Sequence, residues 1–353
     1  MLHVRTFRPA LPPSDAIPRA RLALVTVAAA LLIGACTPAG GGASPATGGQ
    51  GGPGATDAGA ASPAASGAAC DATAFPGWPR PGQVTTSGII PVLASSEKVV
   101  GKTRLLFVLV DQQNRPITND ALDVRLAFFD LCADPANPTE VLTPAFEWGI
   151  VGQRAFYVVT ADLARSGPWG AAVAVHDPAT GTDEVARIQF SVSEGGFGPR
   201  VGDPAPAVRT KTLADVGGNV RQVSSDPQPD PTFYETSLDA ALAAKEPFVL
   251  AFITPAFCTS AQCGPTMDVL KKAVKDAPIR VVAVEPYELV FRDGRLQPVL
   301  QDGSFVPVAA ANAYGIPTEP WIFVVGGDGI IAGSFEAVVG ERELADAIRA
   351  VTK

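Results

Sequence analysis

The chain has 353 residues, of which 47% are hydrophobic and 18% charged, and its formal net charge at pH 7 is −8. An acidic chain without a basic cluster argues against nucleic acid or an anionic lipid surface as a partner. The length leaves room for two domains of ordinary size beyond any targeting segment.

The N-terminus reads as a targeting segment. Four arginines precede an apolar run over residues 22–33, which is too short to span a bilayer comfortably. The run leads into the sequence LIGAC, which ends at Cys36. Small residues before a cysteine resemble the lipobox of bacterial lipoproteins. That resemblance implies that residues 1–35 are a signal peptide and that Cys36 is lipidated; an ordinary secretory signal is the alternative.

Residues 36–69 are predicted to form a disordered tether. After Cys36, every residue of this segment except Gln50 and Asp57 is Ala, Gly, Ser, Thr or Pro. Such a composition buries almost no apolar surface, and a coil of this length spans roughly 30 Å. We therefore expect a monomer in the cell envelope, held to the membrane by a lipid anchor, where disulfides persist.

Residues 70–194 are predicted to form an immunoglobulin-like β-sandwich. Val124, Leu126 and Phe128 alternate with polar or small residues, as in a half-buried antiparallel strand. Helical periodicity is nearly absent, and turn residues separate the short strands. Cys70 and Cys132 both lie here, and a structural disulfide is the default interpretation for them. The expected strands cover residues 103–110, 123–129, 153–160, 170–176 and 184–192.

After a linker over residues 195–200, residues 201–353 alternate between strand and helix patterns, which predicts an α/β domain. Two buried strands separated by a helix indicate a parallel pair. A glycine-rich turn predicts a late hairpin, and an amphipathic helix closes the chain. The expected elements are helices over 238–245, from the cysteines to about 275 and over 341–351, strands over 247–254, 279–285, 321–325 and 330–335, and an inserted hairpin or loop over 287–305.

Two cysteines follow the first buried strand of this domain. The strand leads through Pro255 into Cys258, and Cys263 lies five residues later, where a helix is expected. A helix N-terminus carries a partial positive charge that stabilises a thiolate. A second thiol nearby can then capture the first one once it is oxidised. This arrangement indicates redox chemistry at Cys258 and Cys263.

The order of elements in residues 201–353 resembles the thioredoxin fold, with a thiol after the central strand and a proline before the late hairpin. The sequence YGIPTEPWIFV is similar to the family's approach to its cis-proline. The resemblance implies that Cys258 is the nucleophile, that Pro320 is cis, and that Pro320 presents an extended substrate peptide. Glu319 and Trp321 would flank the same substrate groove, with Glu319 acting on the thiol or as a base.

Two features depart from the thioredoxin pattern. The buried acid of many thioredoxins would fall at Ala251, so that proton relay is missing. The usual CxxC is CxxxxC here, and residues five apart in an unbroken helix rise by about 7.5 Å. Since a disulfide needs Cα atoms within roughly 7 Å, bonding Cys258 to Cys263 requires a loop or an unwound first turn.

The same spacing resembles atypical two-cysteine peroxiredoxins, in which a peroxidatic and a resolving cysteine occur in a TPGCTxxACG run. The corresponding sequence here is TPAFCTSAQCG. The peroxide-positioning motif PxxxTxxC would require Pro at 251 and Thr at 255, where the chain has Ala251 and Pro255. Because this motif is missing, an atypical peroxidase ranks second among the hypotheses for function.

Other interpretations of the cysteine pair stay open. The disulfide could be purely structural, in a non-catalytic lipoprotein whose β-sandwich carries the binding function. The sequence CGPT at Cys263 could be a one-thiol active-site motif, although it lies too far from the strand. A two-thiolate copper(I) site is also open. His176 is the only histidine beyond the signal peptide, and we assign no metal site.

We therefore expect an extracytoplasmic thiol–disulfide oxidoreductase. Its substrates would be protein thiols and disulfides, and a membrane redox partner would supply or accept electrons. We expect no organic cofactor.

Overall fold

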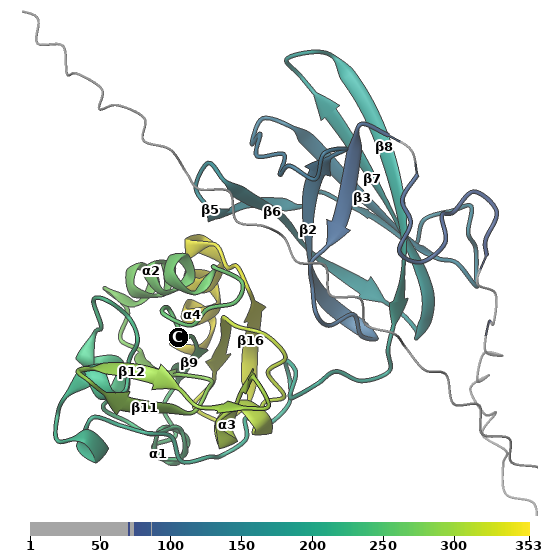
Figure 1. The fold of residues 1–353 in the computed structure, drawn as a ribbon. Helices are drawn as coiled ribbons and strands as arrows, with labels where there is room; N and C mark the ends of the chain where they lie inside the picture. Colours follow the sequence, from purple (N-terminus) through teal and green to yellow (C-terminus); the bar gives the residue numbers. More distant parts are fainter. Residues whose placement is uncertain (1–69, 71–73, 86) are drawn as a thin grey trace, which may run out of the picture. The chain divides into compact units, whose positions relative to one another are not determined.

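The computed structural model describes residue 70 and residues 74–85 and 87–353 (Figure 1). The expected signal peptide, the lipidated Cys36 and the tether lie outside these residues. In the described part of the chain, no helix is both long and apolar enough to cross a membrane.

Two antiparallel four-stranded sheets make up the first part of the described chain, an arrangement compatible with the expected β-sandwich. Their strand orders are β1-β2-β6-β5 and β4-β3-β7-β8. The two sheets share one hydrophobic core, to which β2 contributes Leu105 and Phe107, β3 contributes Leu126 and Phe128, and β7 contributes Trp169. The strands are β1 (Ile89–Leu93), β2 (Gly101–Asp111), β3 (Asp123–Asp130), β4 (Glu140–Leu142), β5 (Ala145–Ile150), β6 (Arg154–Leu163), β7 (Gly167–Asp177) and β8 (Thr182–Val192).

The strands that the sequence did not predict are the short ones and those at sheet edges. β1 contains Pro91, which cannot donate to a ladder and is tolerated because β1 pairs only with β2. β4 has three residues, and β5 ends in an irregular register with β6 near Gly149. Tertiary pairing forms these strands, because their own sequences give little alternation.

A four-stranded sheet with the order β10-β9-β15-β16 organises the rest of the chain. β9 and β10 are parallel, whereas β15 is antiparallel to both β9 and β16. Every residue of β9 and β15 is buried, which explains why both read as continuous apolar runs. The strands of the sheet are β9 (Phe248–Phe252), β10 (Arg280–Val284), β15 (Trp321–Val325) and β16 (Ile331–Glu336).

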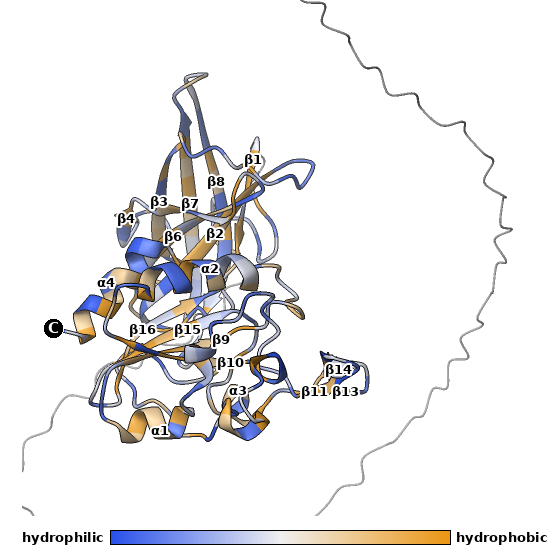
Figure 2. Cartoon of the chain, turned by 90° about the vertical axis from the view of Figure 1, so that its left-hand side faces the viewer, coloured by the Kyte–Doolittle hydropathy of each residue, from blue (hydrophilic) through white to orange (hydrophobic). Residues whose placement is uncertain are grey.

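Helices cover both faces of this sheet (Figure 2). On one face, α2 and α4 contribute Met267, Leu270, Leu344 and Ile348 to a core with β9 and β15. On the other face, α1 and α3 pack against Phe252 and the other large side chains that the four strands present on that face. The helices are α1 (Leu238–Ala243), α2 (Cys263–Val274), α3 (Ala309–Ala313) and α4 (Glu341–Val351), preceded by the 3₁₀ turns η1 (Ala214–Val216), η2 (Val220–Gln222) and η3 (Pro231–Tyr234).

The segment expected as an inserted hairpin or loop contains two small hairpins between β10 and α3. In each hairpin the two strands form a separate two-stranded sheet. Their strands are β11 (Leu289–Arg292), β12 (Arg295–Pro298), β13 (Leu300–Gln301) and β14 (Ser304–Phe305).

The segment expected as a linker is held close to the α/β part. A Cβ added to Gly198 would lie 1.9 Å from the carbonyl oxygen of Tyr314, so only glycine fits there. The described residues belong to one compact unit. Within it, Arg104 of β2 donates to both carboxylate oxygens of Glu343 in α4, at 2.8 Å each.

A disulfide joins Cys70 to Cys132, with 5.9 Å between their Cα atoms. Both cysteines pack on a small apolar cluster that includes Phe75, Trp78 and Phe129. Disulfides form in oxidising compartments, so this bond fits an extracytoplasmic location.

The Cys70–Cys132 disulfide should contribute more stability than the Cys258–Cys263 disulfide. Their sequence separations are 62 and 5 residues. The chain-entropy model predicts losses of about 4 kcal/mol and about 2 kcal/mol, respectively, when each pair is replaced by alanine. Urea unfolding of the two double variants checks the order. An equal or larger loss for Cys258→Ala/Cys263→Ala would contradict it.

Candidate functional site

The two C-terminal cysteines lie where β9 passes into α2. A loop follows the strand, and α2 begins only at Cys263. Ala261 in this loop has φ +60°, a left-handed conformation that costs a residue with a Cβ about 1 kcal/mol. The turn brings the Cα atoms of Cys258 and Cys263 to 5.9 Å, and the two are disulfide-bonded. The loop expected from the CxxxxC spacing is therefore present.

The two sulfur atoms have different surroundings. Cys258 is half-buried, whereas Cys263 is fully buried among the side chains below α2. The amide of Cys263, at the first position of α2, donates to Cys258 Sγ at 3.1 Å. Ser260 Oγ lies 3.4 Å from the same sulfur. The Cys263 amide and the positive end of the helix would stabilise a thiolate at Cys258 after reduction.

Glu319 lies beside the cysteine pair and is 1% exposed. A carboxylate oxygen of Glu319 and the two cysteine sulfurs lie within 4.8 Å of one another. Thr259 donates to Glu319 Oε1 from its amide at 2.7 Å and from its hydroxyl at 2.8 Å. Ser260 Oγ donates to the Glu319 carbonyl at 2.8 Å. The cysteine loop is thus fixed to the segment that carries Glu319.

Tyr287 completes the hydrogen bonding of this carboxylate. Its hydroxyl donates to Glu319 Oε2. Burial, together with the hydrogen bond to Glu319 and the charge of that carboxylate, raises the pKa of Tyr287 well above its usual range. The hydroxyl therefore stays protonated at neutral pH and remains a donor. Tyr287 also stacks at 4.8 Å, in a tilted geometry, on Phe305 of the inserted hairpins.

A second buried carboxyl group lies behind the loop. Glu285 directly follows β10, and burial raises its pKa to about 7, although the hydrogen bond from the Ser225 amide opposes the shift. Ser225 donates its amide to Glu285 Oε1 at 2.6 Å, and Ser225 Oγ accepts the amide of Ala256 at 3.1 Å. Ser225 thereby links Glu285 to the loop that leads to Cys258.

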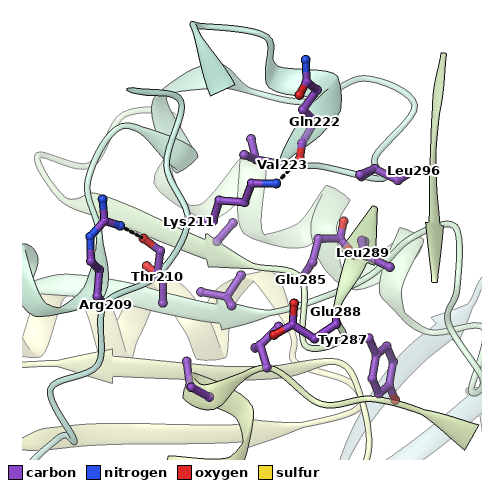
Figure 3. A pocket seen from close by; sticks show the side chains of 15 residues that line it. Arg209, Thr210, Lys211, Gln222, Val223, Glu285, Tyr287, Glu288, Leu289 and Leu296 are labelled. Atoms are coloured by element: carbon purple, nitrogen blue, oxygen red, sulfur yellow. Dashed lines mark hydrogen bonds between the residues drawn. The ribbon is translucent and has the colours of Figure 1, made fainter. Parts of the chain in front are cut away.

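Two hollows border these residues. A pocket of about 360 Å³ has Glu285 and Tyr287 in its wall, with Arg209, Lys211 and Gln222 among its other lining residues (Figure 3). Neither cysteine lines this pocket. A shallower hollow of about 590 Å³ lies directly against the cysteine loop, and its walls include Ala256, Phe257, Leu296, Pro298 and Leu300. Its walls also carry Arg221, Asp226 and Arg295, and it reaches the residue before Cys258 but not Cys258 itself.

The structure brings together most of the residues singled out from the sequence. Cys258, Cys263 and Glu319 converge, and the Glu319–Pro320 peptide bond is cis, the isomer that was expected. Trp321 is not part of the group. It is 6% exposed, its indole donates to Ser334 Oγ at 2.9 Å, and its side chain lies in the hydrophobic cluster on the sheet face opposite the cysteines.

Tyr287 and Glu285 belong to the site but were not predicted from the sequence. Tyr287 lies in the inserted segment, whose position could not be read from periodicity. Glu285 had a readable signal, because it is an acidic residue at the carboxyl end of a buried parallel strand, where side chains of neighbouring strands meet.

The sandwich strands also contact the cysteine loop. Arg154, the first residue of β6, donates from Nη1 to the carbonyl oxygen of Ser260 at 2.7 Å. This bond adds a contact from β6 to the backbone between the two cysteines.

Comparison with known proteins assigns no family. No family model matches the chain, and no curated protein matches it. Among solved structures, the soluble domain of PmoD from Methylocystis sp. ATCC 49242 (Rockwell) is 16% identical over 30% of this chain and 89% of its own, with a TM-score of 0.18. The PKD domain of human SorCS2 is 14% identical over 31% of this chain and 76% of its own, with a TM-score of 0.16. Neither similarity is strong enough to indicate a function.

Glu285 should make stability fall as pH rises. Its pKa is raised in the folded state from 4.5 to about 7, so the folded protein binds the proton more tightly than the unfolded chain. The associated stability is present below pH 4.5 and is lost as pH rises through 7. Between pH 5 and pH 8 this group should lower the free energy of unfolding by about 2 kcal/mol.

Urea unfolding of the disulfide-intact protein at pH 5, 6, 7 and 8 measures this loss. Glu285→Gln, which cannot ionise, should lack it, whereas Glu288→Gln, at an exposed position three residues away, should retain it. The same pH slope in wild type and Glu285→Gln would rule out the assignment.

Proposed function

We propose that this protein is an extracytoplasmic thiol–disulfide oxidoreductase that acts on protein thiols through Cys258 and Cys263. The observation that carries the proposal is the asymmetry of the pair at the strand-to-helix junction. Cys258 is reachable and accepts the first amide of α2, and Cys263 is bonded to it from a fully buried position. An exchange catalyst needs one thiol that solvent-borne substrates can reach and a second that they cannot.

A thioredoxin-like fold for residues 201–353 is part of the proposal. It is supported by the central parallel pair β9–β10, by the antiparallel strands β15 and β16 that extend the sheet, and by helices on both faces. It is also supported by the cysteine pair at the carboxyl end of β9 and by the cis bond before Pro320, which would correspond to the active-site thiols and the cis-proline of that fold.

The exchange follows two displacement steps. The Cys258 thiolate attacks a substrate disulfide, forms a mixed disulfide and releases one substrate sulfur as a thiolate, which takes a proton from solvent. The Cys263 thiol loses its proton and its sulfur attacks Cys258 Sγ. This second step releases the other substrate sulfur as a thiol and leaves the Cys258–Cys263 disulfide. Two electrons pass from the protein to the substrate, and the reverse sequence oxidises a substrate dithiol.

Glu319 is positioned to take part in the proton movements. Its carboxylate lies within 4.8 Å of both sulfurs, and it is oriented by donors from Thr259 and Tyr287. The Cys263 proton therefore has an acceptor inside the site, where solvent does not reach. The hollow beside Phe257 would receive apolar side chains of the substrate protein, and Pro320 would present its backbone.

The remaining sequence features give the proposed location. Lipidation at Cys36 and the tether over residues 36–69 would hold the described part of the protein near a membrane, within reach of a membrane redox partner. No organic cofactor is needed, because both steps use only the protein's own thiols.

The two cysteines should differ in a trapping experiment. Cys263→Ser should accumulate a mixed disulfide with substrate, because nothing resolves it, whereas Cys258→Ser should accumulate none. Non-reducing gels and mass spectrometry after incubation with a disulfide-bonded protein such as insulin measure the adduct. Equal trapping by both variants would contradict the assigned roles.

The reduction potential of the Cys258–Cys263 pair tests the function itself. Equilibration in glutathione buffers, with free thiols counted by mass spectrometry, should give a value between roughly −270 and −120 mV, the range of known exchangers. A value below roughly −300 mV would instead indicate a structural disulfide. Formation of Cys258 sulfenic acid at substoichiometric hydrogen peroxide, without insulin reduction, would favour the peroxidase hypothesis.

A further inference from the structure

Three side chains with metal-binding atoms converge at the cysteine pair. The two Sγ atoms and a carboxylate oxygen of Glu319 lie within 4.8 Å of one another. Cys263 and Glu319 are buried, and Cys258 is half-buried. Reduction of the disulfide would turn this group into two thiols and a carboxylate in a largely water-free place.

The charge of the group is not balanced by basic side chains. Each hydrogen-bond donor to the Glu319 carboxylate in the described residues is neutral, namely the Thr259 amide, the Thr259 hydroxyl and the Tyr287 hydroxyl. None of the ion pairs among the described residues includes Glu319. Buried negative charges are stable only when they are protonated, paired with a cation or coordinated to a metal. A dication would neutralise two of the three acidic groups at once.

We propose that the reduced protein binds one Zn²⁺ through Cys258 Sγ, Cys263 Sγ and the carboxylate of Glu319. Zinc is bound in proteins by thiolate sulfur at about 2.3 Å and carboxylate oxygen at about 2.1 Å. In a tetrahedral site these lengths place the sulfurs about 3.8 Å apart and sulfur and oxygen about 3.6 Å apart. The three atoms can reach these separations by small side-chain movements once the disulfide is open.

The oxygen ligand selects the metal. Soft thiolates alone suit copper(I), whereas a carboxylate oxygen suits a harder ion, and zinc accepts both kinds of ligand. Three protein ligands leave a fourth tetrahedral position open, as in catalytic rather than structural zinc sites. The half-exposed side of Cys258 is where that position meets solvent.

The surroundings of Glu319 resemble a second coordination shell. Metal-binding carboxylates are themselves hydrogen-bonded, which fixes their orientation. Thr259 uses both lone-pair directions of Oε1, and Tyr287 uses one of Oε2. One lone-pair direction on Oε2 is therefore left for a metal ion. The donors come from the cysteine loop and from the start of the inserted segment, so both hold the carboxylate in place.

Zinc and the disulfide exclude each other. Binding requires loss of two thiol protons, and oxidation by a disulfide reagent reverses it. The zinc–dithiolate, one oxidant disulfide and two protons give the Cys258–Cys263 disulfide, two thiols and free Zn²⁺. The site requires the reduced form of the pair that the proposed function uses, but it does not require that the pair exchange with protein substrates.

The test measures zinc binding to the reduced full chain under anaerobic conditions. Competition between the protein and a chromophoric zinc chelator should give one Zn²⁺ per chain with a Kd of micromolar or tighter, and the disulfide form should bind none. Cobalt(II) should give the near-ultraviolet sulfur charge-transfer band and the visible bands of a tetrahedral site. Addition of oxidised glutathione should release one equivalent of Zn²⁺.

Matched variants identify the ligands. Glu319→Gln keeps the shape of the side chain and should weaken zinc binding by about tenfold or more, since loss of even an outer contact costs about 10–100-fold. Glu288→Gln removes an exposed carboxylate next to Tyr287 and should leave zinc affinity unchanged. Cys258→Ser leaves one thiolate ligand and should reduce the cobalt charge-transfer band to about half or less. Circular dichroism verifies that each variant is folded.

Two results would overturn the zinc site. One is unchanged zinc affinity in a folded Glu319→Gln, and the other is tight binding of copper(I) with no measurable binding of zinc. Insulin reduction assayed in excess EDTA reports on exchange alone. Loss of zinc binding with exchange intact would therefore refute the metal site only, and zinc binding without exchange would refute the proposed function only.

Discussion

The attachment of the cysteine loop to Glu319 is the contact on which the whole site depends. Thr259 and Ser260 make three hydrogen bonds to this one residue, two to its side chain and one to its carbonyl. The loop follows β9, and Glu319 immediately precedes Pro320 and β15. Because β9 and β15 are neighbours in the sheet, the loop and Glu319 are already close when the strands pair. The hydrogen bonds then fix the loop in a conformation that a helix would not allow.

The two faces of the central sheet carry different groups of side chains, with the cysteine pair on one face and a large aromatic group on the other. Alternate residues of β9 and β15 point to opposite faces, so Ala251 and Ile322 lie under the cysteines while Phe252 and Trp321 lie on the far side. Phe252, Tyr314, Trp321 and Phe323 form an aromatic group on that far face. A rigid base of this kind holds two strand ends in register, and the cysteine loop and Glu319 extend from those ends.

The sequence predicted the elements whose own residues determine them. The helix over 341–351 and the strand over 321–325 match α4 and β15 at both ends, because an amphipathic face and a continuous apolar run are local patterns. Cys258, Cys263 and Glu319 could be chosen because their chemistry is unusual for their positions. Trp321 was grouped with them by its nearness to Pro320 in sequence, but strand alternation places it on the other face.

The residues that escaped prediction depend on contacts between distant segments. Tyr287 reaches Glu319 across 32 positions of sequence, and nothing in the local pattern of the inserted segment indicates that contact. Ser225 lies 60 positions from Glu285, in a stretch of irregular structure. Polar networks of this kind are assembled by tertiary packing, so a single sequence gives their members only as isolated polar residues.

The inserted hairpins place one aromatic ring between the hollow and the carboxylate of the site. Phe305 of β14 touches both Phe257, in the wall of the hollow beside Cys258, and Tyr287, the donor to Glu319. A partner that enters the hollow and displaces Phe305 also disturbs the stacking that holds the Tyr287 ring. Under the proposed function, the fit of a partner would thereby reach the carboxylate beside the sulfurs through three aromatic rings. Selectivity in such a site would be exercised during chemistry as well as during docking.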